Sequence, residues 1–251
     1  MTDLPAQRFR GGDGAELAWR ELGDGPPVVL LHGLMGSGTL LLDQGPARAI
    51  ADHGYRVILP DLRGHGDSAR PHDPARYPPD VLADDGLALV DHLGLDDYRL
   101  AGYSLGGKLV LRLLARGARP SRAIVGGQGL DALDAESNRT GGYRRLLAAM
   151  ASGSTFEPGS SDEAFAGWVT QTGADPLAIG YLLDSFVPTP REALAQVPTP
   201  TLVVAGDADT RSASAAELTA LLPNGRLVLV PGDHYTALGA PEFIAAVLDF
   251  L

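Results

Sequence analysis

The chain contains no cysteine in its 251 residues, and this absence excludes disulfides, thiolate catalysis and cysteine-ligated metal sites. It also contains a single lysine, Lys108, so its basic side chains are otherwise arginines. No apolar run approaches the length of about 18 residues that a membrane-spanning helix needs. A signal peptide has a basic stretch followed by an apolar one, and the first residues of this chain do not show that pattern. We therefore expect a cytoplasmic protein that does not bind membranes.

Acidic residues outnumber basic ones, and the formal net charge is −11. A chain without a basic patch is poorly suited to release counterions from nucleic acid or from an anionic membrane surface. We therefore expect a small-molecule substrate as the partner rather than nucleic acid. The composition, 45% hydrophobic and 20% charged, is ordinary for a globular protein, and the length fits one large domain. The sequence leaves the oligomeric state open.

Short continuous apolar runs recur along the chain, separated by segments long enough for a helix. Such runs are typical of strands in a parallel sheet that is buried on both faces. Before them, two alternating stretches within Gln7–Glu21, joined by a glycine-rich turn, indicate a β-hairpin. The fold class is therefore α/β, with a mostly parallel central sheet and helices on both faces. The expected parallel strands are 27–31, 55–59, 98–101, 122–125, 201–205 and 226–230.

The stretch 132–196 interrupts this alternation, since it has three or four helical segments and no convincing strand. We interpret it as a helical insertion between two late strands. Residues 1–131 and 197–251 then form the core of the fold.

Several helix starts carry their own local signals. Asp175-Pro176 and Pro241 each place a proline in the first helical turn, where its missing N–H costs nothing. Pro241 begins a last helix that we expect to run to the end of the chain at Leu251. Thr189–Glu192 and Ser214–Glu217 have the spacing of a capping box, in which the first side chain accepts a backbone N–H of the first turn.

The most informative motif is Gly102-Tyr103-Ser104-Leu105-Gly106, which reads G-x-S-x-G. It follows one apolar run and opens another, so a strand is expected to turn sharply into a helix here. Such a turn holds the Ser104 hydroxyl on an exposed elbow, and the small glycines let neighbouring backbone approach closely. The motif therefore predicts a nucleophile.

A serine nucleophile needs a base and an acid that orients the base. His234 follows the last expected strand, at the sheet edge where catalytic side chains converge. Asp209 follows the strand before it and can turn back toward an imidazole, so we assign the acid to Asp209. Asp207 is suited to bracing the same turn. Asp131 and Asp134, after the preceding strand, are further candidates for the acid.

An acyl-transfer reaction also needs donors for the oxyanion of its tetrahedral intermediate. We expect one donor to be the backbone N–H of Leu105, at the start of the elbow helix. The second is expected from the sharp turn His32–Gly36, with the N–H of Leu34 as the best candidate. We expect His32 itself to shape that turn rather than to transfer a proton.

Together these motifs resemble those of α/β-hydrolase-fold enzymes, and the resemblance extends over residues 7–251. It is carried by His32-Gly33 after a strand, the segment Asp61–Ser68, the Ser104 elbow, and the loops with Asp209 and His234. The resemblance implies a Ser104–His234–Asp209 triad. It also implies a helical cap, which the insertion matches, and a structural rather than catalytic role for His65.

Departures from particular subfamilies narrow the reaction. Haloalkane dehalogenases and epoxide hydrolases of this fold use an aspartate nucleophile, and dienelactone hydrolases use cysteine, whereas this elbow carries Ser104. Proline iminopeptidases carry a different turn at 32–36 and a tryptophan where this chain has Tyr103. Ring-cleavage C–C hydrolases typically carry a tryptophan where this chain has Tyr235.

We therefore expect a serine hydrolase that forms an acyl-enzyme on Ser104 from a small-molecule ester, thioester or lactone. A second possibility is a lyase or C–C hydrolase that uses the same triad as a base, since the elbow also resembles that of the menaquinone-pathway synthase. A third is a ligand-binding member without activity. We expect neither a cofactor nor a metal. Substrate contacts are expected from residues beside the serine and from cap aromatics: Met35, Tyr103, Tyr143, Trp168, Tyr181 and Phe186.

Overall fold

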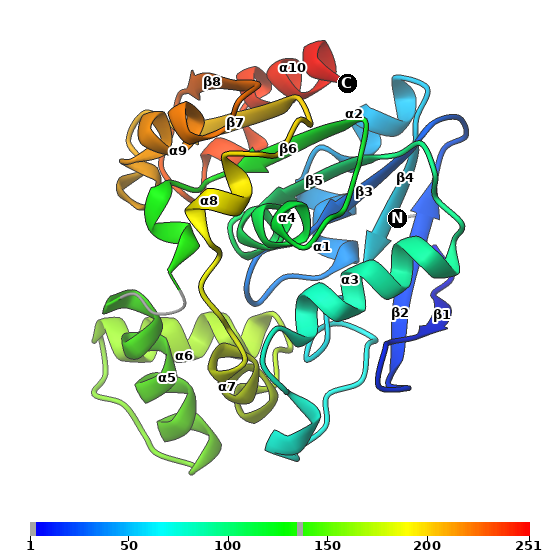
Figure 1. The fold of residues 1–251 in the computed structure, drawn as a ribbon. Coiled ribbons are helices and arrows are strands. Elements are labelled where there is room, and N and C mark those ends of the chain that lie inside the picture. The colour runs from blue at the N-terminus through cyan, green and yellow to red at the C-terminus, as the bar shows by residue number, and fades with distance from the viewer. Residues whose placement is uncertain (1–3, 135–137) are drawn as a thin grey trace.

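The fold is built on one eight-stranded sheet, seen in the computed structural model, which describes residues 4–134 and 138–251 (Figure 1). The strand order is β1-β2-β4-β3-β5-β6-β7-β8. β1 and β2 form the expected antiparallel hairpin, β2 pairs antiparallel with β4, and every later pair is parallel. The strands are β1 Gln7–Arg10, β2 Glu16–Leu22, β3 Pro27–Leu31, β4 Arg56–Pro60, β5 Arg99–Tyr103, β6 Arg122–Gly126, β7 Thr201–Gly206 and β8 Gly225–Val230.

Helices cover both faces of this sheet. One face packs against α3 (Val81–His92), α4 (Leu105–Ala115), α8 (Arg191–Leu194) and α9 (Ala215–Leu221). The other face packs against α1 (Gly38–Gln44), α2 (Ala47–Asp52) and α10 (Pro241–Phe250). Short 3₁₀ turns complete the main body: η1 Pro74–Arg76, η3 Thr210–Ser212 and η4 Ala237–Gly239.

Strand alternation explains why two cores form. In β3, Val29 and Leu31 point into the first core, while Val28 and Leu30 point into the second. Both sets are almost fully buried, which is why the strands read as continuous apolar runs in the sequence. Each large apolar side chain buried in this way contributes about 1.5–3 kcal/mol.

Between β6 and β7 the described residues form helices and no strand. These are η2 (Leu130–Leu133), α5 (Asn138–Ala151), α6 (Ser161–Gln171), α7 (Pro176–Asp184) and the short α8. In Figure 1, α5, α6 and α7 lie together below the sheet, apart from the other helices. We refer to α5–α7 as the cap. Residues 135–137 of the expected insertion, and residues 1–3 of the expected core, lie outside the described residues.

The cap has a small core of its own, which contains Leu147, Val169, Ile179 and Leu183. One residue of the main body, Met35, completes it. By contrast, the side chain of Leu194 on α8 is fully buried in the main core beside α4, so α8 packs with the main body.

Local helix signals had mixed outcomes. α7 begins at Pro176 as expected, and Asp175 caps it, since its carboxylate accepts the N–H groups of Leu177 and Ala178 at 3.0 and 3.1 Å. Both capping-box predictions are wrong. Pro190, not the threonine before it, occupies the N-cap position of α8 and makes no side-chain cap. Ser214 does sit at the N-cap of α9, but its hydroxyl accepts the N–H of Leu130 at 2.8 Å instead.

The start of α10 at Pro241 is confirmed, but the helix ends at Phe250, one residue before the expected end. Strand ends also differ by a residue or two from the sequence-based ranges, as in β5, which continues to Tyr103. Among the described residues, none of the helices has both the length and the hydropathy required to cross a membrane.

Gly106→Ala is expected to cost about 3 kcal/mol or more of unfolding free energy, because the added Cβ would lie 2.1 Å from the carbonyl oxygen of Leu31. The matched control is Gly180→Ala in α7, where a Cβ meets no atom within 4 Å. That change is expected to stabilise the fold by about 0.5–1 kcal/mol. Urea denaturation checks both, and equal effects of the two changes would contradict the close approach at Gly106.

Candidate active site

Ser104 lies between β5 and α4 in a strained backbone conformation, with φ 55° and ψ −118°. Such a conformation is costly for a residue with a Cβ and is held only by its surroundings. Here the Ser104 N–H donates to the carbonyl oxygen of Gly126 at 2.9 Å. An added Cβ at Gly102 would lie 2.3 Å from the carbonyl carbon of Gly106, so the elbow closes this tightly only with a glycine at position 102.

Three side chains that the sequence singled out lie within hydrogen-bond distance of one another. His234 Nε2 lies 2.9 Å from Ser104 Oγ, and His234 Nδ1 lies 2.9 Å from Asp209 Oδ2. Because a carboxylate can only accept, Nδ1 carries the proton and Nε2 is free to accept one from the serine. We call these three side chains the triad. They follow β5, β7 and β8, whose carboxyl ends share one edge of the sheet.

His234 and Asp209 are buried, and hydrogen bonds fix the loops that carry them. His234 and Asp209 are only 7% and 5% exposed, so solvent screens their interaction weakly. The hydroxyl of Tyr103 donates to the carbonyl oxygen of His234 at 2.7 Å and fixes the loop after β8. The second carboxylate oxygen of Asp209 accepts the backbone N–H of Arg211 at 2.8 Å.

Of the remaining candidate acids, Asp207 and Asp131 have other partners for their carboxylates, and among the described residues the structure gives none of the three a hydrogen bond to the imidazole. Asp207 accepts the N–H of Gly232 at 3.0 Å, which ties the loops after β7 and β8 together. Asp131 accepts the hydroxyl of Ser214 at 3.3 Å. The backbone carbonyl of Asp134 accepts a hydrogen bond from Lys108. Asp209 is therefore the carboxylate that faces the imidazole.

The backbone N–H groups of Leu34 and Leu105 belong to residues that line the same cavity as Ser104. Leu105 is the first residue of α4, and the N–H of Lys108 makes the hydrogen bond to the carbonyl of Ser104. The first N–H groups of a helix have no acceptor within it, so that of Leu105 is available to an oxyanion. A Cβ added to Gly33 would lie 3.4 Å from that of Ser104, so the turn before Leu34 backs onto the serine.

Two buried histidines support this turn. His32 Nε2 accepts the N–H of Leu62 at 3.0 Å, so its Nδ1 carries the proton that bonds the carbonyl of Gly33 at 2.8 Å. Burial lowers the pKa of His32 and lowers that of His65 to about 3, so both rings stay neutral. The centroids of the two rings lie 4.9 Å apart in an edge-to-face arrangement, so His65 packs against His32.

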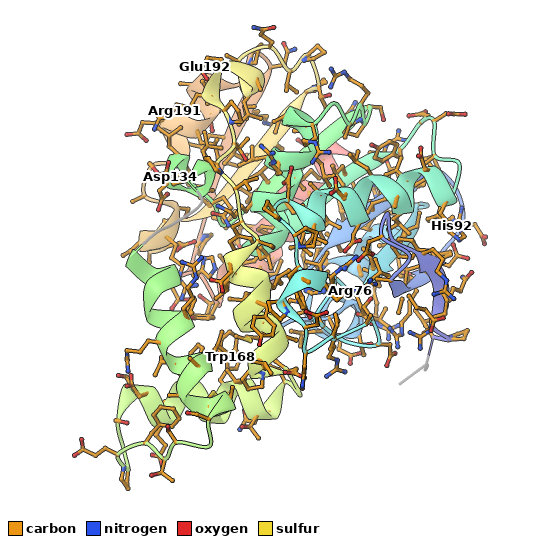
Figure 2. The ribbon with its side chains drawn as sticks, turned by 60° about the horizontal axis from the view of Figure 1, so that its bottom comes forward. Arg76, His92, Asp134, Trp168, Arg191 and Glu192 are labelled. Atoms are coloured by element: carbon orange, nitrogen blue, oxygen red, sulfur yellow. The ribbon has the colours of Figure 1, made fainter. Side chains whose placement is uncertain are left out.

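A cavity of about 460 Å³ opens above Ser104, between the main body and the cap. Its walls include Tyr103, Tyr143, Trp168 and Phe186, four of the six side chains expected to contact substrate. Figure 2 shows Trp168 among the cap helices, with Asp134 above it where the insertion leaves the main body. The cavity therefore lies where the cap faces the triad.

The other two expected contacts, Met35 and Tyr181, do not line this cavity. Met35 is 2% exposed and is held in the small core of the cap. Tyr181 packs against the main core, with its ring 5.9 Å from that of Tyr77. The prediction of Met35 rests on its position near the catalytic motifs, and that of Tyr181 on its spacing along a cap helix. Neither signal tells which way the side chain points.

Sequence reasoning missed five polar residues of the cavity wall: Lys108, Gln128, Arg211, Tyr235 and Thr236. Lys108 lies one helical turn after the serine, Arg211 two residues after the acid, and Tyr235 directly after the histidine. Nearness to the motifs was the available signal. Gln128 follows β6, and its side-chain amide donates to the carbonyl of Ser104.

Lys108 joins the elbow helix to the start of the insertion. Its ammonium donates to the carbonyl of Ala132 at 2.7 Å and to that of Asp134, and it lies 5.5 Å from the ring centre of Phe186. Burial lowers the pKa of Lys108 to about 8, although the charges of Asp134 and Asp131 oppose this shift. Among the described residues, no cluster of three or more histidine, aspartate or glutamate side chains is arranged to hold a metal ion.

A family model described as alpha/beta hydrolase fold matches residues 26–126. A non-heme haloperoxidase of Rhodococcus erythropolis is 30% identical, over 88% of this chain and 89% of that protein. The non-heme chloroperoxidase CPO-A1 of Kitasatospora aureofaciens is 39% identical over 104 residues, which are 41% of this chain and only 36% of that relative. A solved esterase from Thermogutta terrifontis is 25% identical, with a TM-score of 0.77 over 98% of this chain and 97% of that one.

The chain therefore belongs to the α/β-hydrolase fold family. The predicted fold and family resemblance are both confirmed, and the chain is a hydrolase-fold enzyme whose relatives include haloperoxidases and an esterase.

Lys108 makes a testable contribution to stability above neutral pH. Below about pH 8 the ammonium is charged in both the folded and the unfolded protein, and burying the charge lowers the stability of the fold. Between about pH 8 and the ordinary value of 10.5, the folded protein has released this proton while the unfolded chain still holds it. Raising the pH through this window should therefore stabilise the wild type relative to Lys108→Met by about 1–3 kcal/mol. Urea denaturation of both proteins at pH 7 and pH 10 measures this difference, and parallel pH dependence would contradict it.

Proposed function

We propose that this protein is a serine hydrolase that cleaves small-molecule esters through an acyl-enzyme on Ser104. The observation that carries the proposal is the continuous hydrogen bonding of the triad, with both distances at 2.9 Å. A buried carboxylate that orients an imidazole, which in turn faces a serine hydroxyl, is the arrangement that activates a serine.

In the proposed reaction, the Ser104 hydroxyl attacks the ester carbonyl while His234 Nε2 takes its proton. Asp209 stabilises the imidazolium that forms, without itself taking a proton. His234 then gives the proton to the leaving alcohol, and the acyl group stays on Ser104. A water molecule attacks the acyl carbon by the same route in reverse, which releases the acid and restores the hydroxyl.

The oxyanion of each tetrahedral intermediate would be held by the backbone N–H groups of Leu34 and Leu105. Such donors act strongly in a site that excludes water, and losing one typically costs about 10²–10³ in rate. The cavity above Ser104 would hold the acyl and alcohol parts of the substrate. The similarity to a solved esterase supports this choice of reaction.

A second candidate reaction follows from the full-length similarity to a haloperoxidase. If hydrogen peroxide replaces water at the second step, the acyl group leaves Ser104 as a peracid. The same triad and the same acyl-enzyme serve both reactions. Peracid formation from an acetate ester and hydrogen peroxide, measured by halide oxidation, tests this route.

Ser104→Ala should abolish hydrolysis of p-nitrophenyl acetate while changing the unfolding free energy by less than about 1 kcal/mol, because the change removes one partly exposed oxygen. The control is Ser154→Ala, an exposed serine of the cap, which should keep wild-type turnover. Wild-type turnover by Ser104→Ala would show that the nucleophile is misassigned. A wild type that releases no nitrophenol, either in a burst or by turnover, would favour a ligand-binding protein.

Asp209→Asn should lower kcat by about 10³–10⁴-fold, because an amide in place of the carboxylate no longer selects the imidazole tautomer that leaves Nε2 free. Asp207→Asn is the matched control on the same loop, since its amide oxygen can still accept the N–H of Gly232. That variant should stay within about threefold of wild type. Steady-state kinetics with p-nitrophenyl acetate decides, and the reverse ranking would move the acid to Asp207.

A further inference from the structure

Arg211, Tyr143 and Tyr235 form a cluster in the wall of the cavity, beside the triad. The Arg211 guanidinium donates through one nitrogen, Nη2, to the hydroxyls of Tyr143 at 2.9 Å and Tyr235 at 2.6 Å. It also lies 5.1 Å from the ring centre of Tyr235. All three residues line the cavity, which places an arginine side chain in the space that the substrate would enter.

The chain places this cluster close to the reacting groups. Arg211 lies in η3, two residues after Asp209, and Tyr235 directly follows His234. Tyr143 comes from α5 of the cap, and Trp168 of α6 meets the Tyr235 ring edge to face at 6.5 Å. The guanidinium is therefore held by cap and main body together, at the side of the cavity that carries the acid and the base.

The charge of Arg211 is not matched by a carboxylate within the part of the chain that the structure describes. The nearest acid in sequence, Asp209, uses its oxygens for the imidazole and for the backbone N–H of Arg211. The two tyrosine hydroxyls are neutral acceptors. A guanidinium has five N–H donors in a planar fork, and the hydrogen bonds to the tyrosines use only Nη2.

The other cationic side chain of the cavity wall, Lys108, does have carboxylates near it. Lys108 gives hydrogen bonds to the carbonyls of Ala132 and Asp134, and the carboxylates of Asp131 and Asp134 act on its charge. Those two acids also line the cavity, on the side where the insertion begins. Lys108 and these acids therefore compensate one another, whereas Arg211 faces the cavity as a cation held by neutral groups.

We propose that Arg211 is a specificity-determining residue that binds a carboxylate of the substrate. The substrate class is then an ester that carries a free carboxylate, such as a monoester of a dicarboxylic acid. This inference rests on the proposed ester hydrolysis and adds the chemistry of the substrate to it. A guanidinium fork fits a carboxylate through two parallel hydrogen bonds, which a single ammonium cannot reproduce.

The test compares two series of nitrophenyl esters of matched shape. One series carries a terminal carboxylate, from succinate to adipate, and the other replaces that carboxylate with an isopropyl group of similar size. The measured quantity is the ratio of kcat/KM for each anionic ester to that for its neutral counterpart. Spontaneous hydrolysis is subtracted with Ser104→Ala.

Arg211→Gln should lower this ratio by about 10–100-fold for the best anionic ester, mainly through KM, because a charged hydrogen-bonded contact to the bound ester is lost. Arg211→Lys should recover part of the ratio, since it keeps the charge without the fork. Arg10→Gln, an exposed arginine on β1 whose side chain is 71% exposed, changes the net charge equally and should leave the ratio unchanged.

Tyr143→Phe separates specificity from a structural role of the cluster. It removes one of the two acceptors but keeps the guanidinium, so it should keep most of the ratio. If Arg211 only ties the cap to the main body, Arg211→Gln and Tyr143→Phe will lower turnover of both ester series alike and leave the ratio unchanged. That result, across the whole chain-length series, overturns the inference. If turnover of the neutral esters still depends on Ser104, the proposed hydrolysis survives this failure.

Discussion

The site depends on how closely the first turn of α4 approaches the neighbouring strand. A Cβ at Gly106 would lie 2.1 Å from the carbonyl oxygen of Leu31, so only glycine lets the backbone come this near. The close approach sets the start of α4, which directly follows Ser104, beside the end of β3 and the turn after it. Ser104 and the N–H groups of Leu34 and Leu105, which would face an oxyanion, therefore belong to backbone segments that lie against each other.

Sheet order then decides what lies around the serine. β6 lies between β5, which carries the serine, and β7, which carries the acid. Because the insertion leaves the sheet after β6, its chain starts between the strand that carries the serine and the strand that carries the acid, and cap residues line the cavity at the triad. The cavity between cap and triad is a consequence of this topology.

Side chains next to the motifs connect the two parts of the molecule. Lys108 on the elbow helix bonds the first carbonyls of the insertion, and Arg211 and Tyr235 join Tyr143 of the cap. The loops that position the triad therefore also shape the cavity. In such an arrangement, the residues that hold the reacting groups and those that would contact the substrate are neighbours in the chain, so reaction and selectivity are physically linked.

The sequence by itself determined the order of the strands along the chain, and it pointed to the elbow serine, the histidine and the aspartate that the structure brings within hydrogen-bond distance. It could do so because each of these residues lies in a loop after an apolar run, and such runs reveal where strands are, to within a residue or two. It did not determine which cap residues face the serine. Met35 and Tyr181, which the sequence predicts at the cavity, lie in packed cores. Arg211, which the sequence did not predict, lines the cavity. The same limit applies to Ser214, whose hydroxyl bonds Leu130 rather than its own helix. Spacing along a helix reports that one face is buried, and only tertiary packing decides what that face is buried against.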